Sequence, residues 1–331
     1  MKGLIDRYNR KISYLRVSVT DRCNLRCIYC MPSEGIKPLR HEDILRFEEV
    51  KEIVRYGIDW GIDKVRITGG EPLVRKGVVY LVEMLANLKG VSDLSMTTNG
   101  ILLKDYARDL KNAGLQRINI SLDSRDANKF NRITRAERLS LVLDGIEEAL
   151  KRGLEPVKIN VVVMKGINDD EVLDFARMSL DRPLHIRFIE YMPFCNRKGA
   201  ESNAKAQKSS FEFVSASTVK EGLKELGELI PAQVRGVGPA KSFKFEKSLG
   251  TTGFITPMSE HFCATCNRLR LTADGRLYPC LFSDYGVDIK RSLRSGAGSK
   301  EIRELFEKAL KNKPEKHSIK GNNQVMSKIG G

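Results

Sequence analysis

One stretch near the N-terminus decides the fold: Tyr14-Leu15-Arg16-Val17-Ser18-Val19-Thr20-Asp21-Arg22-Cys23-Asn24-Leu25-Arg26-Cys27-Ile28-Tyr29-Cys30. It begins with a β-branched run, which predicts a strand over Tyr14–Thr20. The run then passes into a polar loop that carries three closely spaced cysteines. A strand that ends in a reactive loop is typical of α/β enzymes, whose sites lie at the carboxyl ends of parallel strands.

The same alternation of strand and helix continues outward from this stretch to residue 195. Strands are predicted at Tyr14–Thr20, Lys64–Thr68, Asp93–Thr97, Arg117–Leu122, Val157–Met164 and His185–Tyr191. Amphipathic helical patterns separate them, at Ile44–Ile58, Leu81–Leu88, Leu102–Leu110, Leu139–Leu150 and Val172–Leu180. This order predicts a parallel α/β fold, and a doubly wound open sheet fits it as well as a barrel. Because six strands are too few for a complete eight-stranded barrel, we expect a partial (β/α)6 TIM-type barrel.

The alternation stops near Asn196. Residues 197–210 are polar and small, Pro231–Gly253 is rich in glycine and proline without a strong period, and helices are predicted at Val219–Leu229 and Lys300–Lys311. We therefore expect a barrel over residues 1–195 and a C-terminal region over 196–310 that closes its open side. A polar tail over 311–331 would follow.

Composition limits the possible compartments and partners. The chain has 331 residues, 41% of them apolar, and a net charge of +15. Its longest apolar runs reach only about five residues, which predicts neither a transmembrane helix nor a secretory signal. We expect a cytoplasmic protein without a membrane partner, whose seven cysteines serve metal binding rather than disulfides. The positive charge indicates either a polyanionic ligand or a solvated, lysine-rich surface.

The first cysteine group is Cys23-x3-Cys27-x2-Cys30. Three thiolates do not complete a structural zinc site, which has four ligands. They match three irons of a [4Fe–4S] cluster, with the fourth iron left open for a ligand. A zinc knuckle completed by a distant residue is the alternative.

The second group is Cys263-x2-Cys266-x13-Cys280. It again has three cysteines, which favours a second [4Fe–4S] cluster, while a zinc site with His261 as a fourth ligand is the alternative. Arg268 and Arg270 would point to the same side of a strand. Guanidinium groups bind phosphates through paired hydrogen bonds, so this pair suits an anionic nucleotide.

The cysteine spacing of the first group, with Tyr29 before its last cysteine, resembles the signature of the radical S-adenosylmethionine (SAM) enzymes. Gly69-Gly70-Glu71-Pro72 looks like the SAM-binding motif of that superfamily. Glycines allow a backbone to approach a ligand closely, and the Glu71 carboxylate could accept hydrogen bonds from the ammonium group of SAM. The resemblance implies that the open iron binds SAM and that its reductive cleavage yields a 5′-deoxyadenosyl radical.

Over nearly the whole chain the sequence is similar to one family in that superfamily, molybdenum cofactor biosynthesis protein A, the GTP 3′,8-cyclases. The similarity includes Thr97-Thr98-Asn99-Gly100, Asn119-Ile120-Ser121-Leu122-Asp123, Ile189-Glu190-Tyr191-Met192, Cys263-Ala264-Thr265-Cys266-Asn267-Arg268-Leu269-Arg270-Leu271 and the final Gly330-Gly331. It implies that the radical abstracts the ribose 3′ hydrogen of GTP and that the C3′ radical attacks guanine C8. The product would be (8S)-3′,8-cyclo-7,8-dihydroguanosine 5′-triphosphate, in the first step of molybdenum cofactor (molybdopterin) biosynthesis.

The same resemblance implies the roles of individual residues. Cys23, Cys27 and Cys30 would hold the cluster that binds SAM, and Cys263, Cys266 and Cys280 the cluster that binds substrate. SAM would be contacted by Tyr29, Gly70, Glu71, Ser121 and Met192. GTP would be contacted by Arg16, Arg66, Thr97, Lys158, Arg268 and Arg270. Gly330 and Gly331 would enter the active site and assist catalysis together with Arg16.

The family also implies partners: an electron donor of the flavodoxin or ferredoxin type and a downstream cyclic pyranopterin monophosphate synthase. A homodimer is possible. Two other functions fit parts of the pattern. One is a radical SAM peptide maturase with an auxiliary cluster, although those often carry longer C-terminal cysteine sets. The other is a zinc-ribbon nucleic-acid-binding protein, which the scarcity of aromatic residues (7%) disfavours, so no nucleic-acid partner is expected.

Overall fold

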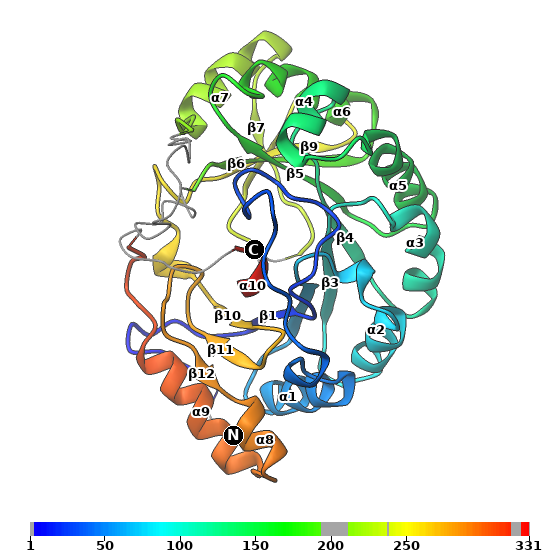
Figure 1. Cartoon of the computed structure of the whole chain (residues 1–331). Coiled ribbons are helices and arrows are strands. Elements are labelled where there is room, and N and C mark those ends of the chain that lie inside the picture. The colour runs from blue at the N-terminus through cyan, green and yellow to red at the C-terminus, as the bar shows by residue number, and fades with distance from the viewer. Residues whose placement is uncertain (1–2, 193–210, 237, 319–325, 331) are drawn as a thin grey trace, which may run out of the picture.

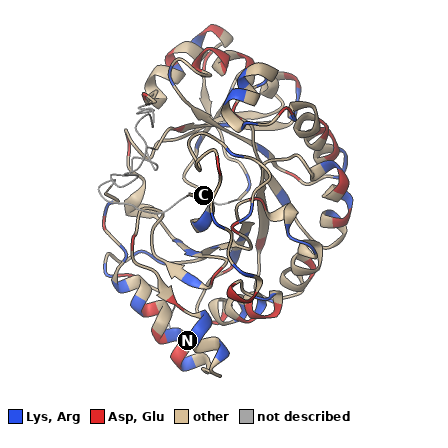
Figure 2. Ribbon diagram, in the orientation of Figure 1, with Lys and Arg blue, Asp and Glu red and all other residues tan. Residues whose placement is uncertain are grey.

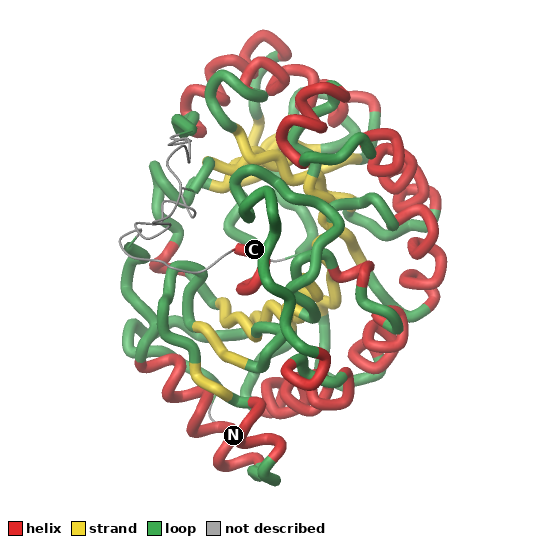
Figure 3. The backbone as a smooth tube through the Cα atoms, viewed as in Figure 1, coloured by secondary structure: helices red, strands yellow, loops and turns green. Residues whose placement is uncertain are grey.

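The computed structural model describes residues 3–192, 211–236, 238–318 and 326–330. Within these residues the strands form one twelve-stranded sheet, in the order β12-β11-β10-β1-β2-β3-β4-β5-β6-β9-β8-β7. The sheet curves around a centre and helices cover its outer side (Figure 1). The tube view shows the strands as an inner layer and the helices as an outer layer (Figure 3).

The N-terminal half supplies the middle of the sheet. Its strands are β1 (Tyr14–Ser18), β2 (Lys64–Thr68), β3 (Asp93–Thr98), β4 (Arg117–Ser121), β5 (Val157–Val163) and β6 (Leu184–Glu190). The connecting helices are α1 (Phe47–Asp59), α2 (Val78–Ala86), α3 (Leu103–Asn112), α4 (Ala127–Thr134), α5 (Leu139–Lys151) and α6 (Val172–Asp181). Neighbouring strands among β1 to β6 pair in parallel. The predicted α/β fold and its six strands are confirmed, and only α4 was not expected.

The C-terminal half extends both edges of this sheet. β9 (Thr251–Ile255) pairs in parallel with β6, and β10 (Arg268–Leu271) pairs in parallel with β1. Antiparallel strands follow outward on each side: β8 (Lys241–Lys244), β7 (Ile230–Pro231), β11 (Arg276–Tyr278) and β12 (Val287–Asp288). β8 and the first half of β9 lie within Pro231–Gly253, where the sequence shows no strong period. Pairing with β6 stabilises β9 despite Gly253 at its centre, which weakens the local strand pattern.

Within the described residues, the C-terminal part of the chain contributes four α-helices. They are α7 (Ala216–Leu223), α8 (Lys290–Arg294), α9 (Ser299–Lys311) and α10 (Met326–Ile329). Short 3-10 helices occur at His41–Asp43, Pro72–Val74, Asp169–Glu171, Lys224–Leu226 and Cys263–Thr265. The helix expected over Val219–Leu229 begins earlier and ends earlier than predicted. α10 lies at the centre of the ring of strands, not on its outside (Figure 1).

Side-chain alternation along the strands separates the core from the interior of the barrel. Leu15 and Val17 of β1 are fully buried in the core between sheet and helices. Arg16, between them, points to the opposite side and lines a central cavity. Among the helices of the described residues, none combines the length and the apolar character needed to cross a lipid bilayer.

Candidate active site

A cavity of about 210 Å³ occupies the centre of the barrel. Its walls come from the inner faces of the parallel strands, from the loop after β1 and from the second cysteine group. The residues expected from the sequence that line it are Arg16, Tyr29, Arg66, Thr97, Ser121, Met192, Cys266, Arg268, Arg270 and Cys280. Figure 2 shows basic positions on the strands around this centre. The fold therefore brings together residues that are as much as 264 positions apart (280 − 16).

A row of arginines crosses the cavity wall because of the strand register. Arg16 on β1 lies beside Arg270 of β10 on one side and beside Arg66 of β2 on the other. All three are buried. Burial, followed by the repulsion of Arg268, lowers the pKa of Arg270 to about 10. Burial also lowers the pKa of Arg16 and of Arg66.

Two arginines of this row, Arg66 and Arg270, have no carboxylate partner within the described residues. The buried arginines that do form ion pairs there include Arg10, with Asp6, and Arg117, with Asp93. The Arg66 Nη2 atom and the nearby Thr97 Oγ1 atom are buried without a hydrogen-bond partner. Unpartnered donors and like charges at this density fit an anionic ligand, because an empty site would leave them uncompensated.

Arg187 of β6 belongs to this site although the sequence analysis missed it. It lines the cavity, its Nη2 atom donates to Asn119 Oδ1, and its buried Nε atom has no partner. Burial, followed by the repulsion of Arg66, lowers the pKa of Arg187 to about 9. The signal was present in the strand pattern, because Ile186 and Phe188 on either side face the core.

Lys158, expected to contact GTP, does not line the large cavity. It lies in a smaller pocket of about 40 Å³ that shares Arg187 and Gly238 with the large one. Its Nζ atom donates to the Arg235 carbonyl. Burial, followed by the repulsion of Arg187, lowers the pKa of Lys158 to about 6. The basic lining therefore continues from the cavity into this pocket.

The first cysteine group lies on the loop after β1. The Cys30 amide donates to the Cys27 carbonyl at 2.9 Å, and the Leu25 amide donates to Cys23 Sγ at 3.4 Å. Burial raises the pKa of Cys27 well above its ordinary value, and the neighbouring thiols of Cys30 and Cys23 raise it further. Three thiols close enough to influence one another fit a shared iron–sulfur cluster, which removes their protons on binding.

Asp123 connects this loop to the sheet. Its Oδ2 atom accepts a hydrogen bond from the Tyr29 hydroxyl at 2.6 Å, and its Oδ1 atom accepts one from the Val162 amide at 2.8 Å. Burial raises the pKa of Asp123 to about 6. The carboxylate thereby fixes the tyrosine that precedes the last cysteine of the group.

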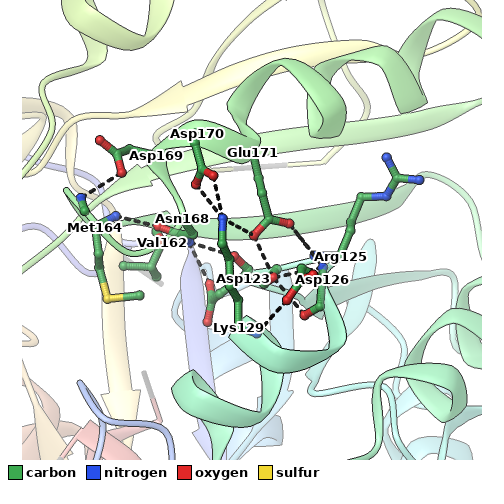
Figure 4. A network of polar contacts seen from close by, with 12 residues as sticks. Asp123, Arg125, Asp126, Lys129, Val162, Met164, Asn168, Asp169, Asp170 and Glu171 are labelled. Carbon is green, nitrogen blue, oxygen red and sulfur yellow. Dashed lines mark hydrogen bonds and ion pairs between the residues drawn. The ribbon is translucent and has the colours of Figure 1, made fainter.

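A polar network behind Asp123 holds the ends of β4 and β5 together (Figure 4). The Asn168 side chain donates to the carbonyls of Asp123 and Val162 at 2.6 and 2.9 Å. Glu171 accepts from the Ser124 hydroxyl and from the Arg125 amide, each at 2.7 Å. Since these bonds join loops from two strands, they fix the rim of the cavity on this side.

The glycine-rich loop after β2 packs directly against the first cysteine group. A Cβ atom on Gly70 would lie 2.3 Å from the Arg22 carbonyl oxygen, so only glycine fits there. The Glu71 carboxylate, 1% exposed, accepts from the Leu73 amide, the Thr98 hydroxyl and the Asn99 amide. These three hydrogen bonds hold the glycine-rich loop in place, and contact between Glu71 and SAM stays a prediction.

Basic groups surround the second cysteine group. Burial raises the pKa of the Cys266 thiol, but the charges of Arg268 and Lys313 outweigh burial and lower that pKa to about 6. Among the described residues, no three Cys, His, Asp or Glu side chains are placed to hold a single metal ion. Cluster cysteines each bind a different iron and lie farther apart than the ligands of one ion. Each cysteine group offers three thiol side chains, a number that fits three irons of a [4Fe–4S] cluster.

The histidine beside this group is not the one weighed from the sequence. His317 Nδ1 lies 3.1 Å from Cys263 Sγ, whereas the ring of His261 packs edge-on against the His317 ring at 4.6 Å. His317 also lines the cavity and stacks on Phe282. Its sequence position, beyond α9, offered no spacing signal that could have identified it.

The described end of the tail lies inside the barrel. Arg270 Nη1 donates to the Gly330 carbonyl at 2.5 Å, and Ile329 is 1% exposed. Gly330 has a φ of 67°, and a Cβ atom there would lie 2.6 Å from Thr68 Cγ2. Glycine is required at this position both by conformation and by space. Gly331 lies outside the described residues.

Comparisons with known proteins agree with this site. Residues 17–179 match the Radical SAM superfamily, and residues 184–319 match Molybdenum Cofactor Synthesis C. A GTP 3′,8-cyclase of Thermodesulfovibrio yellowstonii is 54% identical over 312 residues, which cover 94% of each chain. Another, of Pelotomaculum thermopropionicum, is 48% identical and covers 98% of this chain and 99% of its own.

A solved structure supports the fold independently. SuiB of Streptococcus suis bound to S-adenosylmethionine superposes with a TM-score of 0.56 at 14% identity, over 92% of this chain and 69% of that chain. From the sequence relatives, the chain belongs to the GTP 3′,8-cyclase family of the radical SAM superfamily.

Proposed function

We propose that the protein converts GTP into (8S)-3′,8-cyclo-7,8-dihydroguanosine 5′-triphosphate, the first step of molybdenum cofactor biosynthesis. One observation carries the proposal: a single cavity is lined by Tyr29 of the first cysteine loop, by Cys266 and Cys280 of the second group and by the arginine row. Such a cavity holds an anionic nucleotide between two reactive centres. The full-length relatives named GTP 3′,8-cyclase favour GTP among nucleotides.

The cofactors we assign are SAM and two [4Fe–4S] clusters. Cys23, Cys27 and Cys30 would hold one cluster, and Cys263, Cys266 and Cys280 the other. When bound, the first cluster and SAM supply the radical chemistry that removes the ribose 3′ hydrogen. Tyr29, Gly70, Glu71, Ser121 and Met192 would contact SAM.

The chain's own residues bind and orient the nucleotide. Arg16, Arg66, Thr97, Arg268 and Arg270 would contact GTP, and Lys158 and Arg187 would continue this basic surface into the smaller pocket. Guanidinium groups fix a triphosphate in one orientation, because each offers paired donors. A fixed substrate in a closed site excludes water and presents one hydrogen to the reacting partner.

The tail would complete the site from inside. The Gly330 carbonyl occupies one donor of Arg270, which lies beside Arg16 in the sheet. Gly330, with Gly331 after it, would thereby orient the arginine row for catalysis, with Arg16 as the arginine closest to the reacting atoms.

Several further assignments follow from the proposed reaction and remain predictions. An electron donor of the flavodoxin or ferredoxin type would reduce the first cluster, and a cyclic pyranopterin monophosphate synthase would consume the product. Three other points also remain predictions. They are the division into residues 1–195, 196–310 and 311–331, a homodimer and a cytoplasmic location.

The test is anaerobic incubation of the reconstituted protein with SAM, dithionite and GTP that carries deuterium at the ribose 3′ position. We expect 5′-deoxyadenosine with one deuterium and a product with a bond between C3′ and C8, identified by NMR. Incubation with ATP is the matched control and should yield no cyclised product. Deuterium-free 5′-deoxyadenosine without cyclised GTP would contradict the proposal. Iron analysis should give about eight irons per chain for two clusters.

A further inference from the structure

A lysine is buried directly behind the second cysteine group. Lys313 follows α9 and is 2% exposed. Its backbone amide donates to the Leu310 carbonyl at 2.9 Å, which continues the last turn of the helix. Lysines are almost never fully buried without a partner, because removing an ammonium group from water is costly. The position of this side chain therefore needs an explanation.

The Lys313 ammonium group contacts the segment that carries Cys266 and the segment that carries Cys280. Nζ donates to the Pro279 carbonyl at 2.7 Å and to the Arg268 carbonyl at 2.8 Å. It also donates to Cys266 Sγ at 3.6 Å. Pro279 precedes Cys280 and Arg268 follows Cys266 by two residues. One side chain thus connects the backbone beside two of the three cysteines.

Within the described residues, no Asp or Glu forms an ion pair with Lys313, whereas the neighbouring buried cation Arg10 pairs with Asp6 at 2.5 Å. Arg10 also donates to the Cys263 carbonyl at 2.7 Å. The nearest group able to carry negative charge beside Lys313 is the Cys266 sulfur. A cluster with thiolate ligands would supply that negative charge.

We infer that Lys313 is a positioning residue of the second cluster, which holds the Cys266 and Cys280 segments in place and favours the reduced form of the cluster through its charge. The inference rests on the second cluster of the proposed function. One-electron reduction adds a negative charge to the cluster, and a cation hydrogen-bonded to one of its ligands stabilises that added charge. Lys313 touches neither SAM nor GTP in this role.

The test uses a background in which Cys23, Cys27 and Cys30 are all replaced by Ser, so that only the second cluster contributes to the EPR spectrum. Lys313→Met removes the charge and the donors at similar volume, and Lys313→Arg keeps the charge. Lys311→Met, at the exposed end of α9, is the matched control. The measurement is a dye-mediated redox titration followed by EPR, with iron content determined for each variant.

We expect Lys313→Met to make reduction of the second cluster about tenfold less favourable, which is a shift of about 59 mV to lower potential for one electron. Lys313→Arg should retain most of the parent potential, and Lys311→Met all of it. An unchanged potential and spectrum in Lys313→Met would overturn the inference, as would equal shifts in the Met and Arg variants. If Lys313→Met does not fold, Lys313→Gln, which keeps donors but not charge, is expected to show the same lowered potential.

The outcome also separates this inference from the proposed function. If the background protein with Lys313 intact binds no iron, the second cluster itself is disproved, and the role of Lys313 with it. If the background protein binds a cluster whose reduction potential does not change when Lys313 is replaced, the proposed function stands and only the inference is overturned.

Discussion

The two cysteine groups lie in different electrostatic surroundings. Near the first group the ionisable neighbours include the buried Asp123 and Glu71 together with Arg26, and burial raises the pKa of Cys23 to about 11. Near the second group they are Arg268 and Lys313, which lower the pKa of Cys266 to about 6 against the effect of burial. Each group has three cysteines, but burial dominates around the first group and cations dominate around the second.

This difference matches two different tasks. Negative charge and burial disfavour additional electrons, so a cluster on the first group would give up an electron readily. Cations favour negative charge, so a cluster on the second group would retain electrons and hold an anionic ligand against Arg268 and Arg270. The contrast fits our proposal that a cluster on the first group transfers an electron to SAM and that a cluster on the second group binds substrate.

The largest expected effect tests the first group. Cys27→Ala removes one iron ligand and should abolish the formation of 5′-deoxyadenosine from SAM, because no complete cluster remains to transfer an electron. The measurement is chromatography of 5′-deoxyadenosine after anaerobic incubation with dithionite. Retained SAM cleavage would contradict the task we assign to this group.

The matching change in the second group should separate the two tasks. Cys266→Ala should leave SAM cleavage without GTP near the parent level but reduce cyclised product by more than about a thousandfold, because the substrate loses its bound position. Both products are measured in one incubation, with iron content as the control. Full cyclase activity of Cys266→Ala at normal GTP affinity would show that the second cluster has only a structural role.

The tail tests the basic surroundings of the second group further, since Gly330 contacts Arg270 in the cavity. Deletion of Gly330 and Gly331 should lower cyclised product about a hundredfold, the scale of misplacing reacting groups by about 1 Å. Melting temperature and iron content should stay near the parent values.

Gly330→Ala tests whether added volume at this position, rather than absence of the tail, lowers activity. Gly330→Ala adds a methyl group that meets Thr68 Cγ2 and imposes an unfavourable φ, which costs about 1–2 kcal/mol. Thr68→Ser removes that methyl contact and should restore part of the activity of Gly330→Ala. Wild-type turnover in both the deletion and the Ala variant would show that the tail has no part in catalysis.

The smallest expected effect concerns pH. Since the pKa of Lys158 is lowered to about 6, the ligand-free protein loses this ammonium charge as pH rises through that value. A bound phosphate favours the charged form, so GTP binding above this pH should take up a proton, and affinity should fall by up to about tenfold per pH unit. Calorimetry in two buffers of different ionisation enthalpy, without reductant, measures the uptake.

Lys158→Arg is the matched control, because arginine stays protonated and should bind GTP without proton uptake. Equal uptake in both proteins would show that Lys158 does not contact the phosphates, and the basic surface would then end at Arg187.

The strands of the N-terminal half could be predicted because each is a short β-branched run between clear helical patterns. β9 could not, since Gly253 interrupts its pattern and its stability comes from pairing with β6. The positions of β9 and β10 beside β6 and β1 could not be predicted from local sequence either, because each pairs with a strand that is distant in sequence.

The site residues also divide into those that local sequence predicts and those that only the fold reveals. The cysteine spacing and the Arg268–Arg270 pair are local signals, and both lead to the cavity. Arg187, His317 and Lys313 carry no spacing relative to those motifs, and only the folded chain brings them together. The motif pointed to Glu71, but its hydrogen bonds from the amide of Asn99 and the hydroxyl of Thr98, on another strand and its loop, could not be read from the sequence.

The placement of β9 and β10 on either side of the six N-terminal strands has a consequence for synthesis of the chain. β1 is complete at residue 18, yet its outer partner β10 begins at residue 268. While the ribosome makes the intervening residues, β1 and β6 both present unpaired edges, which are ready templates for association with other chains. Contacts this distant in sequence also slow folding. We therefore expect the nascent chain to depend on chaperones until residue 271 has emerged, and the isolated N-terminal half to aggregate.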